Sequence, residues 1–191
     1  YAGAFYPSCQ TTDLSGNVVV QPPSHMMVRT ILRSDAVSYP WFAPAGTRRG
    51  VVDNATNIGY IDAATGEFVT TKNSVQMRDV EYSNFINPIA FFTNVGFLNY
   101  GNKSSRDTGT ALDRINVGRL VAYIREKLQT SVRPFVFEPN DAKTRSEITG
   151  VVQTLFVDLV AKRGLYDYLV VCDGTNNTPA VIDRSELRID I

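Results

Sequence analysis

The sequence has few of the side chains on which catalytic sites commonly depend. Its 191 residues include one histidine, His25, and two cysteines, Cys9 and Cys172, which lie far apart in the chain. A metal site with several histidine ligands is therefore excluded within this sequence. The two cysteines form neither a metal-binding spacing nor a disulfide framework, so we expect buried free thiols in a reducing compartment.

The chain also lacks an excess of charge and a long apolar run. Nineteen basic and nineteen acidic side chains give a formal net charge of zero, which argues against a binder of nucleic acid or membrane surfaces. No apolar run approaches the roughly 18 residues of a membrane helix. Phosphate-binding loops and G-x-G-x-x-G or G-x-S-x-G motifs are missing as well. The first residue is Tyr1 and not methionine, so we expect part of a longer product.

Two long helices are the clearest elements that the pattern predicts. Apolar residues at helical spacing predict one over Val117–Leu128, with Thr110 or Asn116 as its N-cap. In the second, Thr144-x-x-Glu147 has the form of a capping box, and Gly164 stands where the helix is expected to end. A shorter helix is expected to start after a Ser24 cap and to bury two methionines.

Short apolar runs bounded by Gly, Pro and Asn predict strands. Hairpins are expected within Ile58–Thr71 and Ile89–Tyr100, and alternation predicts a strand at Arg133–Glu138 between the long helices. Tyr166–Cys172 and Leu187–Ile191 are interpreted as two strands around a polar turn. The predicted fold class is therefore α/β (α+β), with a mixed β-sheet flanked by helices.

The last predicted strand ends the sequence in the middle of its pattern. Leu187, Ile189 and Ile191 alternate with Arg188 and Asp190, which indicates one buried face. A strand left at a terminus is either cropped or offered to a neighbour. We expect the protein to meet other copies of itself here.

Two polar clusters allow more than one interpretation. An oxygen-rich group in the polar turn can bind Ca²⁺ or bond its own backbone, and the spacing matches no calcium loop, which favours the turn. That group comprises Asp173, Asn176, Asn177 and Asp183. Four arginines form either an anion-binding patch or ion pairs with acids here or on a neighbour, and ion pairs are favoured. They are Arg29, Arg33, Arg48 and Arg49.

Several segments, taken together and in order, resemble the C-terminal core of contractile tail sheath proteins of phages. The main ones are ALDRINVGRLVAYIREKL (Ala111–Leu128), FEPND with TR soon after (Phe137–Arg145) and GLYDYLVVCDGTNNTPAVIDRSEL (Gly164–Leu187). Upstream, PPS (Pro22–Ser24), RSD (Arg33–Asp35), WFAPAGTRRG (Trp41–Gly50) and INP (Ile86–Pro88) resemble the same family. The expected hairpin Ile58–Thr71 is not explained by the resemblance.

The resemblance implies a structural and mechanical subunit, not an enzyme, that works without a cofactor. Six copies form a ring around an inner tail tube, and the stacked rings contract to drive the tube through the host envelope for genome delivery. The implied partners are other copies, the tube protein, and the baseplate and tail terminator proteins, with no direct nucleic acid and no membrane insertion. The implied place is the virion tail, assembled in the host cytoplasm.

The resemblance also implies how the chain is organised and which residues meet partners. Residues 1–191 are expected to form a single assembly core domain, with a possible internal boundary at 101–110 and with the N-terminal and C-terminal arms of the family absent. Inter-subunit strand exchange is expected at Leu187, Arg188, Ile189, Asp190 and Ile191. Interface charges, or charges that face the tube, are expected at Arg114, Arg119, Arg125 and Lys127.

Three other functions remain open at this point. A close variant is the sheath of a phage-derived injection particle or of a secretion system. A metal-dependent α/β enzyme that uses Asp173 and Asp183 requires carboxylates that converge in a cleft. A small adaptor or tube-binding module that never polymerises is the third.

Overall fold

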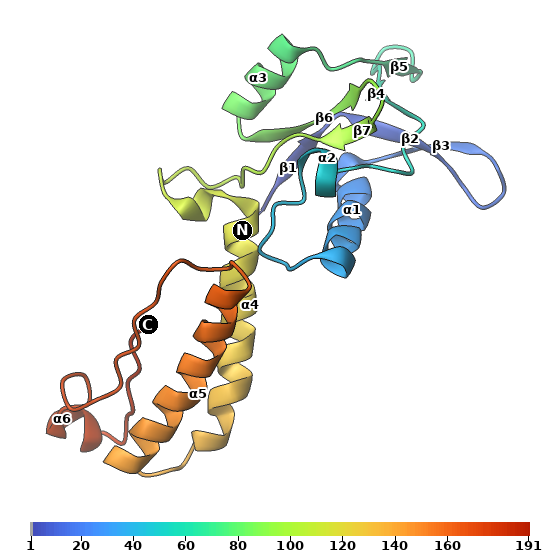
Figure 1. Cartoon of the computed structure of the whole chain (residues 1–191). Coiled ribbons are helices and arrows are strands. Elements are labelled where there is room, and N and C mark those ends of the chain that lie inside the picture. Colours follow the sequence, from blue (N-terminus) through green and yellow to red (C-terminus); the bar gives the residue numbers. More distant parts are fainter. Residues whose placement is uncertain (1) are drawn as a thin grey trace. The chain divides into compact units, whose positions relative to one another are not determined.

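The computed structural model describes residues 2–191, shown in Figure 1. These residues divide into two compact units, 2–120 and 121–191. The division falls inside helix α4 (Ile115–Val132) and not in the polar stretch 101–110, which lies within the first unit. No helix of the described residues is long and apolar enough to cross a membrane.

All of the named strands belong to the first unit. They are β1 (Ala4–Tyr6), β2 (Ser8–Thr12), β3 (Val18–Gln21), β4 (Asn57–Ile61), β5 (Phe68–Thr70), β6 (Ile86–Phe92) and β7 (Gly96–Asn99). Two sheets result, with strand orders β1-β6-β7 and β3-β2-β4-β5. β1 pairs with β6 in parallel, and the other pairs are antiparallel. The α+β class with a mixed sheet and the two predicted hairpins are therefore confirmed.

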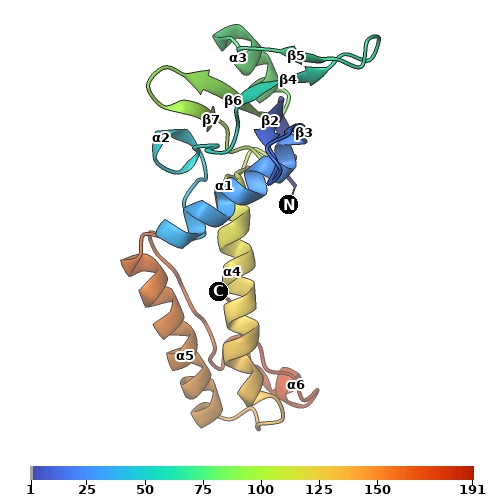
Figure 2. The ribbon, with the colours of Figure 1, turned by 90° about the vertical axis from the view of Figure 1, so that its right-hand side faces the viewer.

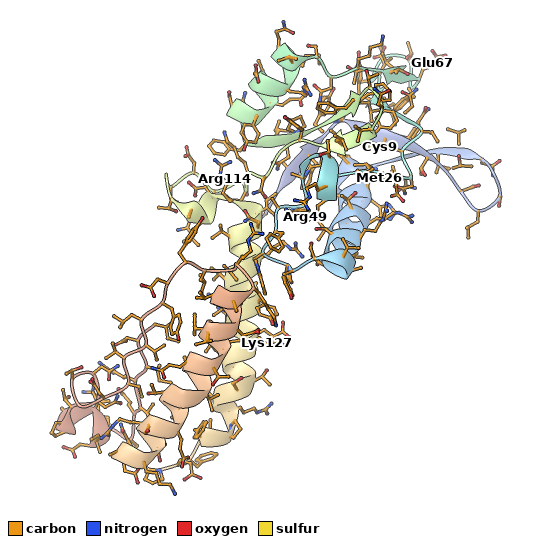
Figure 3. All side chains as sticks on the ribbon, viewed as in Figure 1. Cys9, Met26, Arg49, Glu67, Arg114 and Lys127 are labelled. Atoms are coloured by element: carbon orange, nitrogen blue, oxygen red, sulfur yellow. The ribbon has the colours of Figure 1, made fainter. Side chains whose placement is uncertain are left out.

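Helices cover these strands and close the core. They are α1 (Pro23–Val37), α2 (Gly46–Arg49) and α3 (Val75–Ser83). Figures 1 and 2 show α1 and α3 on opposite sides of β6. The core joins Cys9 from β2, both methionines of α1, and Ile58 and Ile89 from the strands. Cys9 and Met26 are labelled in Figure 3. Both cysteines are buried and free, as predicted.

The start of α1 differs from the prediction. Pro22 is the extended N-cap residue and Pro23 occupies the first helical turn, so Ser24 lies inside the helix. Proline suits this position because its missing N–H has no partner at a helix start and its φ is already helical. The predicted cap at Ser24 is therefore wrong, although Met26 and Met27 are buried as expected.

The second unit contains most of α4, the short 3-10 turn η2 (Arg133–Phe135), α5 (Ala142–Ala161) and α6 (Pro179–Ile182). α4 is preceded in the first unit by the 3-10 turn η1 (Ala111–Asp113), whose N-cap is Thr110. Figures 1 and 2 show α5 beside α4, with the chain after α5 running back alongside them. α5 buries one apolar stripe, formed by Ile148, Val152, Phe156 and Leu159.

The two ends of α5 differ from their predictions. Asp141 caps the start, because its side chain accepts a hydrogen bond of 2.8 Å from the Thr144 backbone N–H. Thr144 is therefore not the cap. At the other end, Arg163 adopts φ 62° and donates its backbone N–H to Val160, while the N–H of Gly164 reaches the Leu159 carbonyl. This pattern is a Schellman motif with an arginine, not the glycine, in the left-handed position.

Three predicted strands do not form. Arg133–Glu138 becomes η2 followed by an exposed loop in which Phe137 is fully exposed. Tyr166–Cys172 and Leu187–Ile191 share only one antiparallel bridge, between Val171 and Asp190. A strand needs a ladder of backbone partners, and among residues 2–191 these three segments find at most one.

Candidate functional site

Asparagine side chains, not a neighbouring strand, hold the C-terminal segment Leu187–Ile191. Asn177 accepts a 2.8 Å hydrogen bond from the Arg188 N–H and donates one of 2.9 Å to the Arg188 carbonyl. Its amide thus makes the two bonds that a paired strand residue makes with its partner. Asn177 is 2% exposed. Two residues further on, Asp190 exchanges two backbone bonds of 2.9 Å with Val171.

The start of α5 positions the partners of Asn177. Asn140, directly before the Asp141 cap, donates to the Asn177 side-chain oxygen at 3.1 Å and to the Glu186 carbonyl at 2.8 Å. Arg145 in the first turn of α5 donates to the Asn140 side chain at 2.7 Å. The C-terminal segment is therefore attached to a rigid helix end through a chain of polar side chains. The contact between Asn140 and Asn177 could not be found from the sequence, because the two residues are 37 positions apart.

One edge of the C-terminal segment has no hydrogen-bond partners. In an extended chain, the backbone groups of alternate residues point to opposite edges. Arg188 and Asp190 bond at one edge, so the backbone groups of Leu187 and Ile189 face the other, where they bond to no described residue. Leu187 and Ile189 are half-buried and Arg188 and Asp190 are exposed, as the alternation predicts, but Ile191 is 55% exposed, so the predicted buried face does not include it. The geometry therefore offers a short edge to an added strand.

The oxygen-rich turn has a structural explanation. Asp173 accepts hydrogen bonds from the Thr175 N–H at 2.8 Å and from the Thr175 hydroxyl at 2.5 Å. These bonds hold the pKa of Asp173 below its ordinary value. Asn176 donates to the Val171 carbonyl at 2.7 Å. Among residues 2–191, no group of three or more His, Cys, Asp or Glu side chains can hold a metal ion.

The four predicted interface cations differ in the contacts that they make. Arg114 donates to the Tyr82 hydroxyl at 2.5 Å, and Arg119 forms an ion pair with Asp35, so both are used within the first unit. Asp113, next to Arg114 in the chain, accepts hydrogen bonds from Thr108 and Thr110.

Arg125 and Lys127 are exposed, as is Arg114, whereas Arg119 is half-buried. Arg125 and Lys127 lie in the second unit, and the Lys127 ammonium is 5.5 Å from the centre of the Tyr123 ring. Arg114 and Lys127 are labelled in Figure 3. A role of these cations at a tube or at a neighbouring subunit stays a prediction.

Arg29 and Arg33 of α1 are ion-paired, as favoured by the sequence. Asp53 receives two hydrogen bonds from Arg29, at 3.3 and 3.2 Å, and a contact of 2.6 Å from Arg33. The hydrogen bond from Arg29, reinforced by Arg33, holds the pKa of Asp53 below its ordinary value. Among the described residues, no ion pair joins Arg48 or Arg49 of α2 to a carboxylate.

The sequence is similar to those of known proteins over most of its length. Residues 107–191 match the family described as phage tail sheath C-terminal domain. The tail sheath protein of Vibrio phage KVP40 is 35% identical over 153 residues, which is 80% of this chain and 21% of that protein. The tail sheath protein of Enterobacteria phage T4 is 36% identical over 154 residues, which is 81% of this chain and 22% of that protein.

Solved structures share the fold over nearly the whole chain. The helical sheath of the anti-feeding prophage in its contracted state has a TM-score of 0.77 at 20% identity, over 98% of this chain and 50% of that chain. The sheath complex of an extracellular contractile injection system, also contracted, has a TM-score of 0.80 at 20% identity, over 99% of this chain and 51% of that chain.

Both the fold and the sequence relate the chain to sheath proteins. Its α+β fold is that of contractile sheath proteins. By sequence, residues 107–191 belong to the phage tail sheath C-terminal domain family, and the chain is similar to phage tail sheath proteins over 80–81% of its length. It spans about a fifth of the length of the curated relatives that it matches, between 21% and 23%.

Proposed function

We propose that this chain is the assembly core of a contractile tail sheath subunit, a structural and mechanical protein. The observation that carries the proposal is the sequence match to tail sheath proteins of phages, which are 31–36% identical over 80–81% of this chain. The sequence match to the sheath C-terminal domain over residues 107–191 supports the same conclusion. A catalytic role has no comparable support, since the relatives are named as sheath proteins.

In this proposal, copies join through strand addition at the C-terminal segment. The free edge at Leu187 and Ile189 accepts an extended arm of a neighbouring subunit, and backbone hydrogen bonds provide most of the attraction. Because such bonds do not depend on side-chain identity, the connection persists while the remaining contacts change between two packings. The two hydrogen bonds between Asn177 and Arg188 hold the C-terminal segment extended before the arm of the neighbouring subunit binds.

The proposed assembly is a stack of six-membered rings around an inner tail tube in the virion tail. Contraction of the stack drives the tube through the host envelope and delivers the genome. The baseplate and tail terminator proteins contact the ends of the stack. A solved structure with the same fold comes from a baseplate, that of the anti-feeding prophage.

A second candidate is the sheath of an extracellular injection particle. The solved structures with the same fold come from such particles, but at 19–22% identity they indicate fold alone. The relatives from phages are 31–36% identical. Sequence therefore favours the phage tail.

A pair of substitutions at Ile189 tests the strand-addition step in the complete gene product. Ile189→Pro removes the N–H at the free edge, whereas Ile189→Ala removes the same half-buried side chain and keeps that N–H. We expect both variants to have the same melting temperature. Electron microscopy should show sheaths from Ile189→Ala and none, or only short ones, from Ile189→Pro. Sheaths of normal length from the proline variant would refute strand addition at this edge.

A further inference from the structure

A small pocket rich in arginine lies in the first unit between α1 and α2. Its volume is about 120 Å³. The lining combines three guanidinium groups with two buried hydroxyls, from Arg33, Arg48, Arg49, Thr30 and Ser34. Arg49 is labelled in Figure 3. Neither the family comparison nor the predicted strand exchange gives this pocket a role.

The positive charge of the pocket is not balanced within the described residues. Arg33 contacts Asp53, but Asp53 is already held by two hydrogen bonds from Arg29. Arg48 forms no hydrogen bond, ion pair or ring contact with any residue of the described range 2–191. The pocket therefore presents more cationic donors than its own unit uses.

The donors of the pocket are partly fixed in place. The Arg49 guanidinium lies 4.7 Å from the centre of the Phe42 ring, and its Nε donates to the Ala43 carbonyl at 3.4 Å. Ser34 is 2% exposed, and its hydroxyl oxygen is 3.5 Å from that of Ser38. Ser38 donates at 2.7 Å to the Ser34 carbonyl, so its proton is already used. The buried Ser34 hydroxyl thus has a weak partner and can donate to an acceptor in the pocket.

The volume of the pocket and its guanidinium groups indicate which chemical group it can bind. A volume of about 120 Å³ corresponds to about four water molecules at about 30 Å³ each. This space is large enough for a carboxylate group. Guanidinium groups match carboxylates through paired N–H donors, and such charge-assisted bonds are stronger than neutral ones.

We propose that this pocket receives a carboxylate side chain from a second copy of the chain. The inference rests on the proposed function, in which copies pack against one another. A chain with zero net charge that exposes unbalanced arginines here must expose unbalanced acids elsewhere. Glu138 and Asp183 in the second unit are exposed and form no ion pair within the described part of the chain. The contact joins two different surfaces, and such heterologous contacts generate either closed rings or open helical arrays.

Arg48 provides a clean test, because it is exposed and no described residue depends on it. In the complete gene product, we compare Arg48→Gln and Arg48→Lys with Arg106→Gln, a control at an exposed arginine outside the pocket. The readout is the protein concentration at which half of the material pellets as polymer. We expect about a tenfold rise for Arg48→Gln, which is the worth of one charge-assisted bond of about 1.4 kcal/mol. Arg48→Lys should show a smaller rise, and the control none.

The possible outcomes separate this inference from the proposed function. If the wild type polymerises and Arg48→Gln does so at the same concentration, the pocket inference fails while the sheath assignment stands. If the wild type forms no polymer under any condition, both fail. If inorganic phosphate raises the melting temperature of the wild type but not of Arg48→Gln, and polymerisation is unaffected, the pocket binds a free anion and the second copy is refuted.

Discussion

Asn177 is the residue whose removal tests the attachment of the C-terminal segment most directly. In Asn177→Ala, Arg188 loses a hydrogen bond at its N–H and another at its carbonyl, and Asn140 loses an acceptor. A net contribution of about 1 kcal/mol per bond predicts that the free energy of opening the segment falls by about 2–3 kcal/mol. Exchange of the Arg188 amide hydrogen should therefore become about 30- to 150-fold faster.

Hydrogen–deuterium exchange measures this change residue by residue. Gln153→Ala, on the exposed side of α5, is the control and should leave the Arg188 amide unchanged. Asn177→Asp is the matched variant, because it keeps the acceptor for the Arg188 N–H and loses the donor to the carbonyl. Its carboxylate then lies against a carbonyl oxygen, so we expect fast exchange near pH 7 and partial recovery at acidic pH, where the protonated acid can donate. If the exchange rate of the Arg188 amide rises less than about threefold in Asn177→Ala, the proposal that Asn177 holds the C-terminal segment is refuted.

Two further substitutions test the folded units. Leu159→Ala should lower the free energy of unfolding by about 2–5 kcal/mol in urea titrations, because Leu159 is fully buried. Leu155→Ala should lower it less, because Leu155 is only half-buried. Equal effects would mean that the buried face of α5 is misassigned. Asp53→Asn should lower the melting temperature near pH 7, because a carboxyl pKa depressed in the folded state stabilises it above the ordinary value of about 3.9. That stability is lost as the pH falls through the folded-state pKa, so the two proteins should converge in more acidic solution, and a constant difference across the titration would contradict the ion pair.

Elements stabilised by local interactions could be predicted from the sequence. The apolar spacing in α4 and α5 identifies each helix, because residues three and four apart share one face. The hairpins β4–β5 and β6–β7 follow from short turns between apolar runs. Cap positions were less predictable, since Asp141, Thr144 and Pro22 all lie in sequences that allow more than one start.

Features that depend on distant partners could not be predicted. The alternation in Arg133–Glu138 and Leu187–Ile191 is typical of strands, but a strand also requires a neighbour, and the sequence does not state whether one is present. The hydrogen bonds by which Asn140 and Asn177 hold the C-terminal segment also join residues far apart in the sequence. They were not predicted, because asparagine in a turn normally bonds its own backbone. The sequence predicted ion pairs for Arg29 and Arg33, but it did not identify Asp53 as their acidic partner.

The measurement that tests the central proposal most directly is electron microscopy of the complete gene product expressed alone. The proposal predicts hollow, striated cylinders built from stacked rings, with a short, wide form after contraction. Reconstruction of these cylinders should place an added strand against the backbone of Leu187 and Ile189. Discrete particles that never polymerise, at any salt or protein concentration and in the presence of the tube protein, would contradict a sheath subunit.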